Sequence, residues 1–182
     1  MPETIIKSKI IPPSPPVNIL HRERLINLLK DNLNKKIILI TASAGYGKTT
    51  IVLDLLSMSN LNYCWLNSHN LIGSLYSFLL YLIESIRTLS SNFGGDLEKL
   101  INGLEKDAQK INNIDEFINE ICIMISNEII DTFKDEIYLV IDNIHEISHH
   151  IWLNAFLEKL LSYQPYNFHL IITSRSGLNI HT

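Results

Sequence analysis

The segment from Ala42 to Thr50 reads Ala-Ser-Ala-Gly-Tyr-Gly-Lys-Thr-Thr and has the residue types of a phosphate-binding loop, or P-loop. Such a loop needs backbone N–H groups that point inward, a lysine that reaches the outer phosphates, and a hydroxyl that contacts Mg²⁺. Gly45 and Gly47 permit the tight curvature. Lys48 would hold the β- and γ-phosphates, and Thr49 would contact the metal. We therefore predict that ATP (or ADP) and Mg²⁺ bind at Ala44, Gly45, Tyr46, Gly47, Lys48, Thr49 and Thr50.

The motif departs from the usual pattern G-x-x-x-x-G-K-[ST] because Ala42 replaces the first glycine. The alternative interpretation is a glycine-containing turn with an incidental lysine. The turn nevertheless follows an apolar run, Lys36 to Thr41, and opens a helical pattern, Thr49 to Met58. A helix that begins there directs its free N–H groups and the positive end of its dipole toward an anion. This placement favours the phosphate-binding interpretation.

An acid at the end of another apolar run would complete the metal site. Asp142 ends the run from Glu136 and would emerge at the carboxyl edge of a parallel sheet, where it would position Mg²⁺ through water. The alternative is an acid that only caps the next turn. Many ATPases place a carboxylate directly after this acid to orient the attacking water, but here Asn143 cannot accept a proton. Glu146 would be a substitute if the chain curls there, so we predict ATP binding with slow hydrolysis.

Two further groups of residues are candidates for a site. Arg175 closes the last apolar run, where an arginine could sense the γ-phosphate; the alternative is an ordinary exposed arginine. His145, His149 and His150 suggest a metal site, but no other residue nearby has suitable spacing. We interpret the three histidines as a surface or hinge cluster.

The elements that must position these residues alternate between strands and helices. Continuous apolar runs predict strands at 36–41, 62–67, 136–142 and 168–175, the first of them buried on both faces. Helical spacing predicts helices within 18–33, 49–58, 75–86, 114–133 and 152–161, with a loop and a modest helix across 90–113. This alternation predicts an α/β fold in which a parallel sheet carries helices on both faces. Residues 1–34 would form a proline-containing leader and first helix, and residues 35–182 the nucleotide-binding core.

Composition narrows the class of protein. The 182 residues carry a net charge of −4, with 46% hydrophobic and 19% charged residues, as expected for a globular domain without general affinity for nucleic acid. No secretory signal and no run long enough to span a bilayer is visible. Cys64 and Cys122 stand far apart and are interpreted as reduced core thiols. We expect a cytoplasmic protein.

Together, these motifs resemble the STAND class of signal-transducing ATPases, and within it the MalT-like branch of large LuxR-type transcriptional activators. The resemblance extends over nearly the whole chain. It rests on Lys9 and the prolines of the leader, Arg22-Glu-Arg24-Leu25, the P-loop, Trp65-Leu66-Asn67, Phe78 with Tyr81-Leu82, Leu139 to His145, and Ile172 to Arg175.

The resemblance implies a P-loop NTPase with an additional strand (ASCE), in which the Arg175 strand lies between the P-loop strand and the Asp142 strand. It also implies that Arg22 lies near the adenine or ribose. Family members continue with a fifth strand, a helical lid, a sensor region and a DNA-binding helix-turn-helix. The chain stops at Thr182, so we expect an incomplete core that lacks the fifth strand and contacts no DNA directly. Its partners would be the missing lid and sensor domains, or a second copy at the unpaired edge of the P-loop strand.

Three functions remain open from the sequence. The first is an ATP-dependent regulatory switch in a MalT-like transcriptional activator. The second is a P-loop kinase for a small molecule, although only Arg87 and Arg175 follow the P-loop to serve as lid arginines. The third is a degenerate module used for interactions, although Lys48 and Thr49 are intact.

Overall fold

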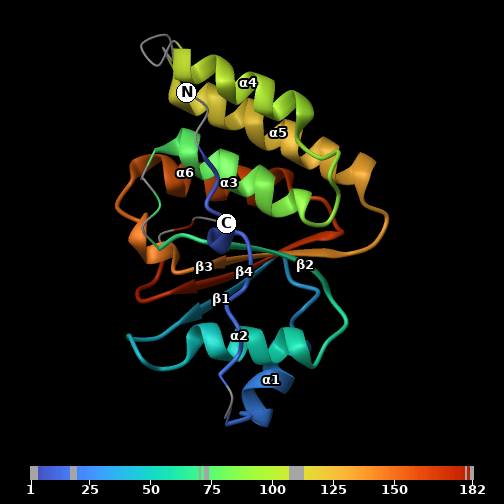
Figure 1. The fold of residues 1–182 in the computed structure, drawn as a ribbon, viewed down its shortest axis with the longest axis vertical. Helices are drawn as coiled ribbons and strands as arrows, with labels where there is room; N and C mark the ends of the chain where they lie inside the picture. The colour runs from blue at the N-terminus through green and yellow to red at the C-terminus, as the bar shows by residue number, and fades with distance from the viewer. Residues whose placement is uncertain are drawn as a thin grey trace.

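The computed structural model describes residues 4–16, 20–69, 71, 74–106, 113–178 and 180, with side chains left out of the description at 104–106. Figure 1 shows the chain as an α/β fold with a central sheet. The strands are β1 (Ile37–Thr41), β2 (Asn62–Asn67), β3 (Ile137–Asp142) and β4 (Phe168–Ser174). The helices are α1 (Glu23–Lys30), α2 (Lys48–Ser57), α3 (Leu75–Arg87), α4 (Gly95–Lys106), α5 (Ile114–Thr132) and α6 (Ile151–Tyr163), with short 3₁₀ turns η1 (Lys7–Lys9) and η3 (Ile144–Glu146).

The sheet has the strand order β1-β4-β3-β2, and every neighbouring pair is parallel. This order confirms the predicted P-loop NTPase topology with an additional strand, because β4 lies between the P-loop strand and the Asp142 strand. In register, Thr41 lies opposite Ser174, and Asn67 lies opposite Asp142. The carboxyl ends of all four strands therefore meet at one edge of the sheet.

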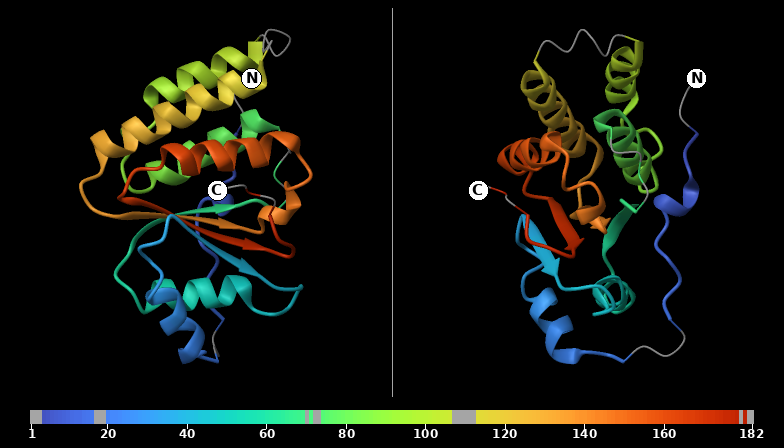
Figure 2. Two further views of the ribbon diagram at one scale, coloured as in Figure 1. Left: turned by 180° about the vertical axis from the view of Figure 1, so that it is seen from behind. Right: turned by 90° about the vertical axis from the view of Figure 1, so that its left-hand side faces the viewer.

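Helices cover both faces of the sheet, as predicted. Figure 2 shows α2 and α1 on one face, and α3 and α6 on the other with α4 and α5 outside them. The two faces have separate apolar clusters: Val52 and Leu55 of α2 are fully buried under one face, and Phe156 of α6 is fully buried over the other. Neither β3 nor β4 exposes a single residue. None of the helices in the described part of the chain is long and apolar enough to cross a membrane.

The prediction that the P-loop strand is buried on both faces is wrong for β1. Its residues are only partly covered, and 38% of Leu39 is exposed. The physical reason is its place at the edge, because β4 is its only neighbour within the described residues. A groove of about 470 Å³ runs along this edge between β1 and α1, and its lining includes Leu25, Leu28 and Leu29.

The polar stretch after α3 contributes more to the core than its sequence indicated. Phe93, Leu97 and Ile101 are fully buried there, and α4 packs on α3. Arg87 ties the two helices together, because its guanidinium contacts Glu84 and Glu98. Residues 107–112, within the predicted loop, lie outside the described part. The described leader runs along the outside of the domain (Figure 2). It is held there by a hydrogen bond from the Ile6 N–H to the Tyr81 hydroxyl, at 3.1 Å.

Candidate nucleotide site

The predicted P-loop connects β1 to α2 and has a backbone that only glycine adopts readily. Gly45 and Gly47 have φ of 81° and 78°, in the left-handed region, while a Cβ at either position would meet no close neighbour. The glycines are therefore required by backbone conformation and not by space. Gly47 is the N-cap of α2 and offers no side chain to the first turn. The N–H groups at the start of α2 thus lack a side-chain acceptor and suit an anion.

Lys48 is the first residue of α2 and is 9% exposed. Its ammonium donates to the backbone carbonyl oxygens of Ala42 at 2.7 Å and of Ser43 at 3.0 Å. The lysine thus turns back over its own loop and brings a positive charge to the loop interior. A phosphate oxygen there would compete with neutral carbonyls for a charged donor, and charge-assisted bonds are the stronger ones.

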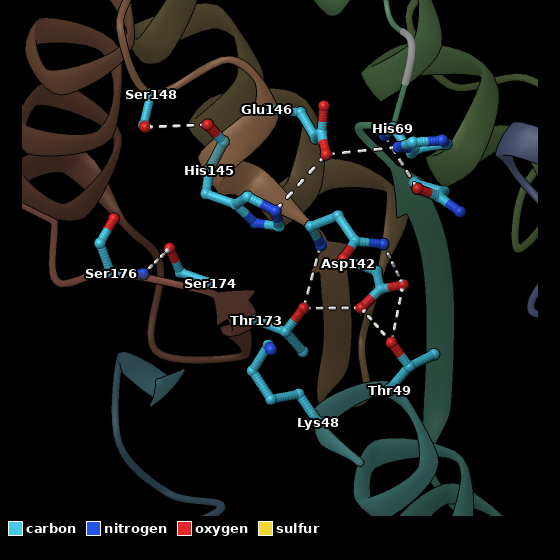
Figure 3. Close-up of polar contacts among 12 residues, drawn as sticks. Lys48, Thr49, His69, Asp142, His145, Glu146, Ser148, Thr173, Ser174 and Ser176 are labelled. Carbon is cyan, nitrogen blue, oxygen red and sulfur yellow. Dashed lines mark hydrogen bonds and ion pairs between the residues drawn. The ribbon is translucent and has the colours of Figure 1, made fainter. Parts of the chain in front are cut away.

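The hydroxyl of Thr49 and the carboxylate of Asp142, 93 residues apart in sequence, meet at the carboxyl edge of the sheet. Thr49 Oγ1 lies 2.9 Å from Asp142 Oδ1 and 3.1 Å from Oδ2 (Figure 3). Thr173, from β4, donates its hydroxyl to Asp142 Oδ1 at 2.6 Å. Asp142 is only 1% exposed, so packing and these hydrogen bonds fix its direction. Hydroxyl and carboxylate oxygens are the hard ligands that Mg²⁺ prefers, and this set fits the predicted metal.

Asn143 follows β3 and is the only non-glycine residue with positive φ in the described part of the chain, at φ 62°. Its backbone N–H donates to Thr173 Oγ1 at 2.9 Å, and its side-chain Nδ2 donates to Asp142 Oδ2 at 2.9 Å. The amide is therefore turned toward the metal-positioning acid. In this position the side chain orients Asp142, and it has no group that could take a proton from water.

Glu146 ends the turn η3 and faces two imidazole rings. Its Oε1 lies 3.3 Å from His69 Nδ1 and 3.5 Å from His145 Nε2. In Figure 3, Glu146 lies on the far side of His145 from Lys48 and Thr49. The structure thus places Glu146 behind His145 as seen from Lys48 and Thr49, and its carboxylate faces His69 and His145.

Of the interpretation as a surface or hinge cluster, the surface part is wrong for His145, because only 11% of its side chain is exposed. Burial lowers the pKa of His145, and the charges of Arg175 and Lys48 lower it further. His149 is exposed and lies against His150, with ring centroids 4.0 Å apart and the ring planes tilted by 41°. His149 and His150 thus lie against each other, while the charges of Lys48 and Arg175 act on His145 at the edge of the candidate site.

The two candidate arginines lie at different ends of the P-loop region. Arg175 is exposed directly after β4, where its charge acts on His145. Arg22, the residue before α1, donates from Nη1 to the carbonyl oxygen of Tyr46 at 3.3 Å. Arg22 also lines a pocket of about 260 Å³ together with Gly45, Gly47 and Thr50. The arrangement offers one cation near the strand ends and another beside the loop.

A family model described as Nephrocystin 3, N-terminal, matches residues 17–175. The chain belongs to this family. It is similar to the HTH-type transcriptional regulator MalT of Vibrio cholerae, with 26% identity over 171 residues, and to that of Yersinia pestis, with 29% over 173 residues. Each match covers 94% of this chain and 18% of the relative. A solved structure of C. elegans PCH-2 is 19% identical with a TM-score of 0.39, covering 88% of this chain and 35% of that one.

The chain is thus a MalT-like P-loop NTPase region, and it spans 18% of the length of those relatives. Sequence reasoning about its site missed two contributors. The sequence analysis gives Thr173 no role of its own, and it treats His145 only as one histidine among three. A polar residue at the end of the central strand could have indicated Thr173, because the carboxyl ends of parallel strands meet at one edge. No sequence signal indicates that the turn after Asn143 folds inward.

Proposed function

We propose that this region is an ATP-binding regulatory switch of a MalT-like transcriptional activator and that it hydrolyses ATP slowly. The observation that carries the proposal is the contact between Thr49 Oγ1 and Asp142, at 2.9 Å. A hydroxyl at the start of the P-loop helix and an acid at the end of a neighbouring strand are the pair that positions Mg²⁺ between the β- and γ-phosphates. Their convergence supports ATP·Mg²⁺ as the ligand.

In this proposal each residue of the site has a role that its contacts support. Lys48 leaves the carbonyls of its loop and binds the β- and γ-phosphates, while the N–H groups from Ala44 to Thr50 surround them. Bound Mg²⁺ would neutralise phosphate charge, with Thr49 as a ligand and Asp142 acting through its water shell. Arg175, exposed at the strand edge, would bind the γ-phosphate and report its presence.

Slow hydrolysis follows from the residues that would have to activate water. Asn143 is hydrogen-bonded to Asp142 and cannot accept a proton. Glu146 is engaged with His69 and His145 behind the site. A bound ATP would therefore persist, which suits a switch whose two states differ in nucleotide-dependent contacts.

A small-molecule kinase is less consistent with the arginines. Arg87 is held by Glu84, by Glu98 and by the carbonyl oxygen of Phe93, at the α3–α4 junction. Arg175 is left as the arginine after the P-loop that could approach a transferred phosphate in this region. Kinases typically use several arginines for that purpose.

We also propose how the region is used in a longer protein. Residues 1–34 would form a leader and first helix, and residues 35–182 the nucleotide-binding core. DNA recognition would belong to other parts of the protein, consistent with a net charge of −4 here. The open edge of β1 would pair with a lid or sensor segment or with a second copy.

Nucleotide titration by isothermal calorimetry tests the proposal. Wild-type protein should bind ATP·Mg²⁺ in the micromolar range, about −8 kcal/mol. Lys48→Ala should weaken binding by about 10- to 100-fold, because a hydrogen bond to a charged group contributes about 1.5–3 kcal/mol. Lys99→Ala is the matched control, since Lys99 is exposed on α4 and pairs with Asp96. Equal affinity in wild type and Lys48→Ala would contradict the assigned site, and phosphate transfer to a small molecule would favour the kinase.

A further inference from the structure

A pocket of about 260 Å³ lies beside the P-loop, and Asp142 does not line it. Its walls are formed by Pro16, Leu20, Arg22, Gly45, Gly47, Thr50, Ile51 and Asp54. Loop residues that would surround phosphate thus share this pocket with apolar side chains and with one acid. Such a mixture suits the nucleoside end of a nucleotide, whose base is flat and apolar on its faces and carries hydrogen-bonding groups on its edges.

Asp54 is the unusual member of this lining, because it is a carboxylate in the middle of α2 that is only 1% exposed. Its Oδ1 accepts a hydrogen bond from His21 Nδ1 at 2.9 Å. Its Oδ2 is buried and has no hydrogen-bond partner among the described residues. A buried, unpaired carboxylate oxygen is costly, so it favours any ligand that brings an N–H or O–H group to it.

His21 fixes which oxygen remains available. The ring lies just before α1 and is 61% exposed, while its Nδ1 edge meets the buried acid. A carboxylate accepts only, so the contact requires a proton on Nδ1. His21 therefore occupies Oδ1, and Oδ2 is the oxygen that has no partner among the described residues.

The spacing between Thr50 and Asp54 along α2 matches the spacing between the phosphates and the nucleoside of a nucleotide. Thr50 lies in the first turn of the helix, next to the P-loop, and Asp54 lies four residues later. Four residues advance a helix by about 6 Å. That distance corresponds to the step from the innermost phosphate to the sugar and base.

We propose that Asp54, held by His21, is the specificity-determining acceptor of the nucleoside subsite, and this rests on the proposed binding of ATP. Asp54 Oδ2 accepts a hydrogen bond from a donor on the nucleoside, either a ribose hydroxyl or the exocyclic amino group of the base. Leu20 and Ile51 contact the base on its apolar faces. The P-loop thus supplies affinity for phosphate, and the pair of Asp54 with His21 selects the nucleoside.

The test measures the affinities of five ligands with Mg²⁺: ATP, 2′-deoxy-ATP, 3′-deoxy-ATP, purine riboside triphosphate, which lacks the 6-amino group, and inorganic triphosphate. In the wild type, the analogue that lacks the bonded donor should bind about tenfold or more weakly than ATP. Asp54→Asn should weaken ATP by a similar factor and should abolish the difference between that analogue and ATP. Inorganic triphosphate should bind wild type and Asp54→Asn equally.

Two additional variants keep the test decisive. His21→Ala changes an exposed side chain and should reduce the preference for ATP over the discriminated analogue, with triphosphate binding unchanged. Asp31→Asn, an acid after α1 that does not line the pocket, should change nothing. If ATP binds wild type but all three analogues bind as well as ATP, the inference about Asp54 is overturned while the proposed function stands. If neither ATP nor triphosphate binds, the proposed function itself fails.

Discussion

The substitution Asn143→Asp replaces the side-chain NH₂ group beside Asp142 by a carboxylate oxygen. The Asn143 amide donates to Asp142 Oδ2 at 2.9 Å, and its backbone N–H donates to Thr173 Oγ1. The backbone has φ 62°, a conformation that asparagine and aspartate both tolerate. The substitution therefore leaves the turn intact and places two carboxylates where a hydrogen bond joined the side chains.

The loss of stability can be worked out from that exchange. A hydrogen bond to a charged group contributes about 1.5–3 kcal/mol, and this contribution is lost. Repulsion between the carboxylates adds to it, reduced as the new side chain turns toward solvent. A total of about 3 kcal/mol would lower the Tm by roughly 6–12 °C for a domain of this size. Bound ATP·Mg²⁺ should restore much of the loss, because a divalent cation offsets the added negative charge.

The same change should increase ATP hydrolysis, because a carboxylate after Asp142 can accept a proton from water. General-base catalysis contributes about 10²- to 10⁴-fold, so an increase of at least about tenfold is expected even with imperfect geometry. Calorimetric Tm values with and without ATP·Mg²⁺, and single-turnover hydrolysis, measure the two effects. Asn143→Gly is the control, since it keeps the left-handed backbone without a carboxylate and should hydrolyse ATP no faster than wild type. Unchanged Tm and unchanged hydrolysis in Asn143→Asp would refute the reasoning.

Two further predictions concern packing. Gly94→Ala should destabilise the fold by about 2–4 kcal/mol in urea unfolding, because φ is 83° and an added Cβ would overlap Ile83 Cγ2. Gly95→Ala, where a Cβ meets nothing within 4 Å, should leave the free energy of unfolding unchanged, and equal effects of the two variants would contradict this account. Burial raises the pKa of the Cys64 and Cys122 thiols from 9.0 to about 12. Both should resist a thiolate-specific reagent at pH 8 until the protein unfolds. Because the unfolded chain loses these protons first, their contribution to stability should fall as the pH rises above 9.

Much of the fold could be predicted from the sequence because its signals are local. The apolar runs placed β2 at the residues observed and the other strands within about one residue, since only strands of a covered sheet are apolar on both faces. The apolar runs did not predict the order of the strands in the sheet, because strands of similar composition do not specify which strands they pair with. The order was implied by the family resemblance. The edge position of β1 shows the consequence, as its apolar sequence is like that of a central strand although Leu39 is partly exposed.

The sequence by itself determined the P-loop, because the glycine conformations, the lysine and the helix start lie within nine consecutive residues. Only the tertiary structure decided which distant groups join it. It brought Thr49 to Asp142 across 93 residues, covered most of the His145 side chain, and set His21 against Asp54 across 33 residues. These pairs depend on how helices and loops pack around the sheet. Burial and long-range contact are properties of the packed chain, which no local pattern specifies.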